Sequence, residues 1–147
     1  MLKLLVKVRK EAENQVAKMS TAQALIKQAL RRIGAVGEGD VPSGDQDNDA
    51  LTELNQLLSD LQDFQVPIGD GSLSLSSTVA VDVSDERNII WLLCEQLLVE
   101  YPSQNAALIA AKAIGARTSL INKYITVGKL DVDSALLKGP FFDINTG

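Results

Sequence analysis

The side chains that could take part in chemistry are few and scattered in this chain of 147 residues. The chain has no histidine and one cysteine, which excludes histidine-based catalytic triads, the common zinc sites and an internal disulfide. Cys94 lies in the apolar run IIWLLCEQLL, so a small buried core residue is the favoured interpretation and a reactive thiol is the alternative. The cysteine therefore does not predict a site.

Glu95 and Glu100 are the carboxylates that come closest to a catalytic pair. Glycoside hydrolysis needs two carboxyl groups across a cleft with divergent pKa values, and sequence positions cannot show that arrangement. A cell-wall hydrolase using one of them is a distant possibility, which should lose activity on a Glu→Gln substitution. We expect no enzymatic activity and no cofactor.

Two further patterns resemble ligand sites and fail on context. Asp45, Asp47 and Asp49 alternate as calcium ligands do, but position twelve from Asp45 is Gln56 where a calcium loop has glutamate. The segment GAVGEGDVPSGD is rich in glycine but has no Lys-Ser/Thr pair and no preceding strand, so it is not a phosphate loop. Helix capping is the preferred role for the aspartates, and we expect no metal site.

Charge is distributed unevenly along the chain. Residues 1–18 carry five basic and two acidic groups, a net charge of +3, whereas the remainder carries nine basic and seventeen acidic groups, a net charge of −8. Lys3, Lys7, Arg9 and Lys10 could contact nucleic acid or an acidic partner, and the alternative is a solvated helix face. The acidic remainder argues against tight wrapping of DNA.

Helical periodicity predicts most of the elements that must position these groups. Ala22, Leu25, Ile26, Ala29, Leu30 and Ile33 form one stripe, and so do Leu51, Leu54, Leu57, Leu58, Leu61 and Phe64. We expect helices over residues 1–18, from Thr21 to Ile33, from Asp47 or Asp49 to Phe64, from Ser84 or Asp85 to about Glu100, and from about Gln104 to Val127.

Capping signals set the expected ends of these helices. Ser20 with Gln23 has the spacing of a capping box, and Gly34 suits the left-handed residue that ends a helix. The helix that contains Trp91 is apolar nearly all round, which predicts a central position. Trp91 is expected to pack in the core rather than stack on a ligand, and Gly115 indicates close packing or a slight kink.

Residues 66–83 change to a period of two. Leu73 and Leu75 alternate with serines, and Val79, Val81 and Val83 alternate with smaller or polar residues, so we expect a β-hairpin turning near Ser76 and Ser77. The predicted fold class is mainly α: a four-helix-bundle-like domain over residues 19–128 with this insertion. Residues 1–18 form a basic N-terminal extension helix, and residues 129–147 form an extended C-terminal arm.

The C-terminal arm is too apolar for a solvated terminus. Its apolar residues are Leu136, Leu137, Phe141, Phe142 and Ile144. They either fold back onto the chain's own helices or bind a partner, and the sequence leaves both open. No run approaches the ~20 apolar residues that span a bilayer, and no signal peptide is recognisable, so we expect a soluble intracellular product.

The layout resembles the head-to-tail adaptor proteins of tailed bacteriophages, of the podovirus tail accessory (head-completion) type. The matching features are LI-x-x-ALR-x-IG from Leu25 to Gly34, DAL-x-x-LN-x-LL from Asp49 to Leu58, the helix end from Leu97 to Pro102 and the alanine-rich helix after it. The likeness covers roughly residues 20–128, and residues 1–18 have no counterpart in it.

The resemblance implies a non-enzymatic virion protein, made in the host cytoplasm, in a dodecameric ring at the head–tail junction. Its implied partners are the portal protein, downstream tail proteins, other copies of itself and, transiently and without sequence preference, the DNA in the channel. It implies no membrane span. The runner-up from a different class is a small helical DNA-binding or regulatory module that uses the basic N-terminal helix.

Overall fold

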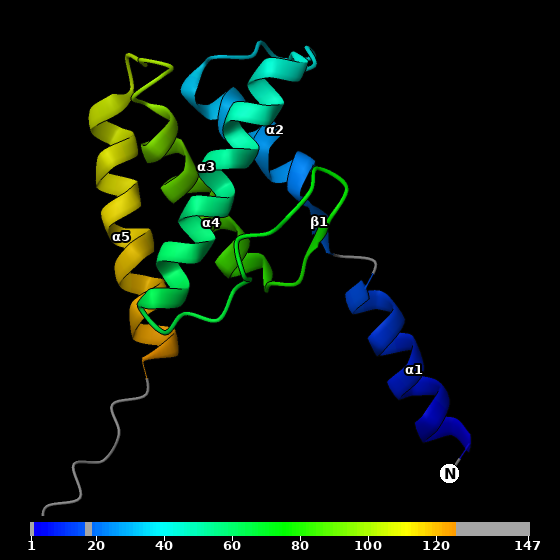
Figure 1. The fold of residues 1–147 in the computed structure, drawn as a ribbon. Helices are drawn as coiled ribbons and strands as arrows, with labels where there is room; N and C mark the ends of the chain where they lie inside the picture. Colours follow the sequence, from blue (N-terminus) through cyan, green and yellow to red (C-terminus); the bar gives the residue numbers. More distant parts are fainter. Residues whose placement is uncertain (1, 17–18, 126–147) are drawn as a thin grey trace, which may run out of the picture.

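The computed structural model describes residues 2–16 and 19–125, with side chains described for 2–10 and 19–125. Within these ranges the protein is mainly helical, with five α-helices and one small antiparallel sheet. The elements are α1 (Leu2–Val16), β1 (Ser20–Thr21), α2 (Ala22–Ile33), α3 (Gly44–Asp63), β2 (Thr78–Val79), α4 (Val83–Leu97) and α5 (Ala106–Tyr124). Figure 1 shows α2 to α5 packed together and α1 projecting away from them. Residues 19–125 are called the helical body below.

The helix α4 is central, as its nearly all-round apolar sequence predicts, because it packs against α2, α3 and α5. Its buried apolar residues are Ile89, Ile90, Leu92, Leu93, Cys94 and Leu97. Burial of a leucine or isoleucine side chain contributes about 1.5–3 kcal/mol, so this helix supplies a large part of the core. It begins after Asp82, slightly earlier than predicted, and ends at Leu97 rather than near Glu100.

The helix α2 buries the predicted stripe and ends at the predicted glycine. Gly34 has φ 82°, the left-handed conformation expected for this position. The cap differs by one residue: Thr21 Oγ1 accepts from the backbone N–H of Ala24 at 3.2 Å. The prediction of Ser20 was wrong because Ser20 belongs to β1, and its hydroxyl donates to Glu86 Oε1 at 2.8 Å.

The helix α3 starts earlier than predicted, directly after Ser43. Ser43 Oγ accepts from the backbone N–H of Gln46 at 3.2 Å, and Gln46 Oε1 accepts from the backbone N–H of Ser43 at 3.0 Å. This is a complete capping box, which satisfies two backbone donors that a helix start leaves unpaired. Asp45 and Asp47 lie in the first turn, as predicted, where the helix dipole favours negative charge.

The leucine stripe of α3 faces the core except at its end. Leu54, Leu57, Leu58 and Leu61 are buried. The prediction that Phe64 extends the stripe was wrong, because Phe64 is the C-cap residue and 59% of it is exposed. The helix ends at Asp63, one residue before this ring.

The predicted β-hairpin within residues 66–83 is not formed. β2 instead pairs with β1, antiparallel, with Ser20 opposite Val79 and Thr21 opposite Thr78. The backbone N–H groups of Ala22 and Gln23 extend this contact by donating to the carbonyls of Ser77 and Leu75. The hairpin prediction failed because the partner strand lies far away in the sequence, before α2.

The rest of this segment is an ordered loop laid over the core. Leu73 and Leu75 are partly buried against it, which accounts for their apolar spacing without a strand. Asn55 of α3 fastens the loop: its Nδ2 donates to the Leu73 carbonyl at 3.0 Å and its Oδ1 accepts from the Leu73 N–H at 2.8 Å. The Asn55 side chain therefore makes the two backbone hydrogen bonds with Leu73 that a neighbouring strand would otherwise make.

The helix α5 covers α4 with a narrow stripe formed by Ile109, Ala113, Ala116 and Leu120. It runs from Ala106 to Tyr124, shorter than the predicted Gln104 to Val127. Gly115 does not pack closely within the helical body, because it is exposed and an added Cβ would meet no atom within 4 Å. The C-terminal arm lies outside the described residues.

Candidate interaction surfaces

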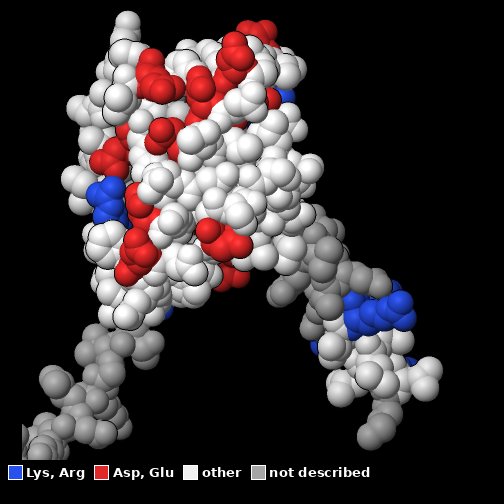
Figure 2. All heavy atoms as spheres, in the orientation of Figure 1, with Lys and Arg blue, Asp and Glu red and all other residues white. Residues whose placement is uncertain are grey.

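The basic residues predicted for contact, Lys3, Lys7, Arg9 and Lys10, all lie exposed on α1. Lys3, Lys7 and Lys10 are spaced by four and three residues, so they form one stripe along the helix. Residues 2–10 contain no acidic side chain, and Glu11 and Glu13 follow in the second half of α1. Figure 2 shows their positive charge gathered on the projecting helix. The structure therefore brings the predicted basic residues together on one element.

The apolar residues of α1 are exposed as well. Leu4, Leu5 and Val8 are 70%, 68% and 58% exposed, and they form a strip beside the lysine stripe. A helix of this length is marginal alone and usually depends on packing of its apolar face. Contiguous exposed apolar residues of this kind mark interaction sites in soluble proteins.

The apolar residues predicted for partner binding, Leu136, Leu137, Phe141, Phe142 and Ile144, lie outside the described residues. Folding back onto the helices and binding a partner therefore both stay predictions for these residues.

The outward side of α5 is a second uncovered apolar surface, which sequence patterns did not single out. Leu108 and Ile114 are 54% and 61% exposed. Between them the helix presents Ala111 and Gly115, which are exposed and leave the backbone close to the surface. The signal was present in the sequence, since α5 is apolar around most of its circumference while only one stripe can face α4.

The face formed by α3 is acidic. Figure 2 shows acidic side chains spread across the side of the molecule on which α3 lies in Figure 1. This helix has six carboxylates and no lysine or arginine. Asp49, Glu53 and Asp60 fall on one stripe, called the α3 acidic stripe below. The ion pairs join Arg117 to Glu95 and Lys123 to Asp82 and Asp85, and no carboxylate of α3 is in an ion pair with another described residue.

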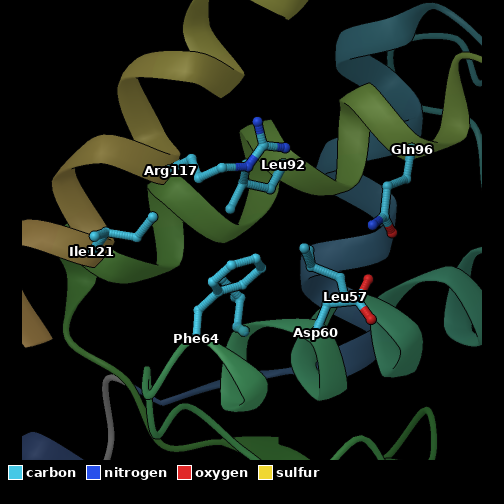
Figure 3. Close-up of a pocket in the computed structure, with 8 residues that line it drawn as sticks. Leu57, Asp60, Phe64, Leu92, Gln96, Arg117 and Ile121 are labelled. Atoms are coloured by element: carbon cyan, nitrogen blue, oxygen red, sulfur yellow. The ribbon is translucent and has the colours of Figure 1, made fainter. Parts of the chain in front are cut away.

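A small pocket lies between α3 and α5, and residues of α4 complete its lining. Figure 3 shows Leu57, Asp60 and Phe64 from α3 facing Arg117 and Ile121 from α5, with Leu92 and Gln96 of α4 between them; Leu61 completes the lining. Its volume is about 130 Å³, enough for one large apolar side chain rather than for a cofactor.

One wall of this α3–α5 pocket has an unsatisfied polar atom. Gln96 Oε1 is buried and accepts no hydrogen bond from any described residue. A buried acceptor left without a donor is unfavourable by about 1–3 kcal/mol. The pocket therefore combines apolar side chains with Asp60 at its α3 edge and Arg117 at its α5 edge, and it is short of one hydrogen-bond donor.

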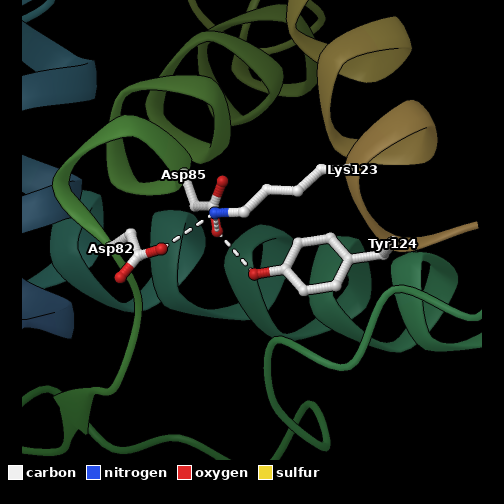
Figure 4. Close-up of polar contacts among 4 residues, drawn as sticks. All are labelled: Asp82, Asp85, Lys123 and Tyr124. Atoms are coloured by element: carbon white, nitrogen blue, oxygen red, sulfur yellow. Dashed lines mark hydrogen bonds and ion pairs between the residues drawn. The ribbon is translucent and has the colours of Figure 1, made fainter.

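A polar cluster fixes the end of α5 to the start of α4 (Figure 4). Lys123 Nζ donates to Asp85 Oδ2 at 2.8 Å and to Asp82 Oδ2 at 2.9 Å, and the Tyr124 hydroxyl donates to Asp85 Oδ2 at 2.5 Å. The hydrogen bond to Asp85, with that to Asp82, raises the pKa of Lys123 above its usual range. The hydrogen bond to Asp85 and partial burial also raise the pKa of Tyr124. This cluster satisfies a buried carboxylate, which is a structural role.

Each candidate catalytic group is ion-paired, exposed or buried. Glu95 forms an ion pair with Arg117, at 2.7 Å between Oε2 and Nη2, and Glu100 is exposed after α4. Cys94 is fully buried, as the apolar run predicts, and burial raises the pKa of its thiol to about 11. Trp91 is partly buried against the core with the Arg32 guanidinium 4.4 Å from its ring centre, an intramolecular contact rather than a ligand platform.

No helix in the described ranges has the length and apolar character needed to cross a membrane. No protein-family model matches the chain, and no curated protein matches it at a significant level. The uncovered surfaces of α1, α3 and α5 are therefore the features from which a function can be inferred.

Proposed function

We propose that this protein is a structural virion component: a ring adaptor between the portal and the tail that closes the DNA-filled head and extends the DNA channel. In this proposal the helical body is the four-helix-bundle-like subunit of a dodecameric ring, located at the head–tail junction. Residues 1–18 and 129–147 are extensions that bind neighbours.

The observation that carries the proposal is the uncovered apolar surface on the outer side of α5. A helix that packs mainly on α4, and exposes Leu108 and Ile114 on its other sides, is suited to pack against another helix. The small residues Ala111 and Gly115 between them would allow the close approach that the sequence suggested and that the body itself does not use. Subunit-to-subunit helix packing is what the resemblance to phage adaptors implies.

The acidic face formed by α3 supports the channel part of the proposal. A wall of clustered lysines and arginines would hold DNA through its phosphates, whereas the outer side of α3, with five accessible carboxylates and no basic residue, repels them. A channel through which DNA slides is better lined by such a face. Contact with DNA would then be transient and independent of sequence.

The experiment is to follow ring formation with purified portal by native mass spectrometry and negative-stain imaging. Rings of the adaptor on the portal are expected, and Leu108→Asp and Ile114→Asp should prevent them while leaving the monomer folded. Gln104→Asp adds the same charge at an exposed position before α5 and should have no effect. A wild-type chain that stays monomeric with portal present would exclude the proposal.

The C-terminal arm is tested in the same assay. A chain truncated after Gly128 should keep a folded helical body and lose portal binding if the arm binds the portal. Unfolding of the truncated monomer would show instead that the arm belongs to the core.

A second candidate function, duplex-DNA binding by α1, is supported by the exposed lysine stripe. It predicts sequence-dependent affinity that weakens steeply with salt and is lost when Lys3, Lys7, Arg9 and Lys10 are replaced by alanine. Affinity unchanged by these replacements would exclude it.

A further inference from the structure

We infer that α1 binds a second copy of this chain, with its apolar strip in the α3–α5 pocket and its lysine stripe along the α3 acidic stripe. The inference shares with the proposed function the expectation that copies of this chain associate. It goes further by assigning a role to residues 1–18, which the phage resemblance does not cover.

The charges of the two surfaces are complementary. Lys3, Lys7 and Lys10 are exposed, and residues 2–10 have four basic groups and no acidic one. Six carboxylates and no basic residue lie on α3, and none of the six is in an ion pair within the described ranges. Such an arrangement steers association and disfavours the wrong partner.

The apolar parts are arranged alongside the charges in the same way on both surfaces. On α1, the exposed strip Leu4, Leu5 and Val8 is flanked by Lys7. On α3, Leu57 and Phe64 line the pocket beside Asp60 and Glu53. An approaching helix can therefore place a leucine in the pocket while a neighbouring lysine reaches an α3 carboxylate, because long lysine stems lie along apolar surface with the ammonium group in water.

The pocket has features that an occupant would satisfy. Phe64 is 59% exposed at its mouth, so its ring offers apolar area to an occupant. The buried Gln96 Oε1 at its wall has no donor among the described residues, so a donor on the occupant would find an acceptor there. Both features favour an occupant that combines apolar side chains with hydrogen-bond donors.

Charge also distinguishes α1 from the other apolar segment of the chain. Residues 126–147 contain two lysines and three aspartates, so the C-terminal arm would meet an acidic face with no attraction. The basic helix is therefore the better match for this surface.

The test exchanges the charges between full-length chains. One variant has Lys3→Glu and Lys7→Glu, and a second has Glu53→Lys and Asp60→Lys. Each variant alone sets like charges against each other, so its self-association should weaken at least about tenfold by sedimentation and native mass spectrometry. An equal mixture of the two should associate like the wild type, because each α1 then meets an oppositely charged face of the other variant.

The matched control for the α3 variant is Glu38→Lys with Glu100→Lys, which makes the same change in net charge at exposed positions outside α3 and should leave association unchanged. If the mixture associates as weakly as its two components, the inference is overturned, and α1 would instead contact the helical body of its own chain. Weakening by the α3 variant alone also overturns it and indicates another occupant, such as the C-terminal arm. Weakening of duplex-DNA binding alone by the α1 variant would assign the lysines to nucleic acid instead.

The outcomes separate this inference from the proposed function. Rings on the portal that are insensitive to all four substitutions remove the role of α1 and leave the adaptor proposal standing. A wild-type chain that remains monomeric both alone at high concentration and with portal removes both.

Discussion

Gly34 and Gly115 place the same residue type in two opposite backbone conformations. Gly34 has φ 82°, which L-residues adopt at a cost of about 1–2 kcal/mol, and Gly115 is inside α5. An added Cβ meets no atom within 4 Å at either position, so the backbone alone decides the effect. Gly34→Ala should lower the free energy of unfolding by about 1 kcal/mol, and Gly115→Ala should raise it by about 0.5–1 kcal/mol.

Urea denaturation of the two alanine variants measures both effects, and each serves as the control for the other. Equal destabilisation by both would show that Gly115 has a packing role within the monomer. Gly115→Ala that stabilises the monomer but weakens association would place this glycine at the subunit contact proposed for α5.

The cluster of Lys123, Tyr124 and Asp85 predicts an alkaline limit to stability. The folded state raises the pKa of both Lys123 and Tyr124 above their unfolded values of about 10.4 and 10. Both groups therefore stabilise the fold fully below about pH 10, and their contribution is lost as pH rises further. The urea midpoint should be flat from about pH 7 to pH 8. Above that it should fall, first through the buried Cys94 thiol, whose unfolded pKa is about 8.5, and then through Lys123 and Tyr124.

The double variant Lys123→Met with Tyr124→Phe isolates this cluster. Its midpoint should be lower at neutral pH and should fall less above about pH 10. Some fall should remain, because burial also raises the pKa values of Cys94 and Tyr101. A double variant with the same alkaline slope as the wild type would show that these two groups do not set the limit.

At the scale of elements, the start of α3 depends on one serine. Ser43→Ala removes the acceptor for the backbone N–H of Gln46 and should lower the free energy of unfolding by about 1 kcal/mol. Ser84 is the matched control: it is exposed in the first turn of α4 but is not the cap residue, so Ser84→Ala should stay within about 0.5 kcal/mol. Equal effects in chemical denaturation would contradict the assignment of the cap.

Local patterns predicted the elements whose causes are local. The stripes of α2 and α3 and the terminating Gly34 were predictable because each depends on residues within one or two helical turns. The capping box of α3 was readable too, since Ser43 and Gln46 have the required spacing. The glycine-rich composition around Ser43 favoured a loop, so the predicted start of the helix, Asp47 or Asp49, was too late in the sequence.

Long-range contacts were not predictable in this way. The pairing of Ser20 with Val79 brings together segments separated by two helices, and a period of two in residues 66–83 favours a local hairpin just as well. Phe64 continues the heptad-like spacing of its leucines, yet α3 ends before the ring can reach the core. These differences concern where the chain turns rather than which residues are apolar.

At the scale of the whole molecule, the candidate surfaces follow from which faces remain uncovered. The four basic residues of α1 could be chosen from charge alone, but the exposure of Leu4 and Leu5 beside them could not. The α3 acidic stripe and the outer side of α5 likewise became candidates only after α4 was seen to occupy their inner sides. The hydrophobic periodicity of a helix identifies the face that is buried in the core. It does not show whether another face contacts a second chain.

The helix α1 should add little to the stability of the helical body of its own chain. Because the described side chains of α1 are all exposed, a chain that begins at Met19 should unfold within about 0.5 kcal/mol of the full chain. Circular dichroism should show the loss of helical signal from α1 with an unchanged urea midpoint. If the midpoint falls by more than about 1 kcal/mol, α1 packs on its own body and the contact with a second copy is excluded. If stability is kept and self-association is lost, residues 1–18 act between chains, because a segment that adds no stability to the monomer can strengthen the assembly only through contacts made outside it.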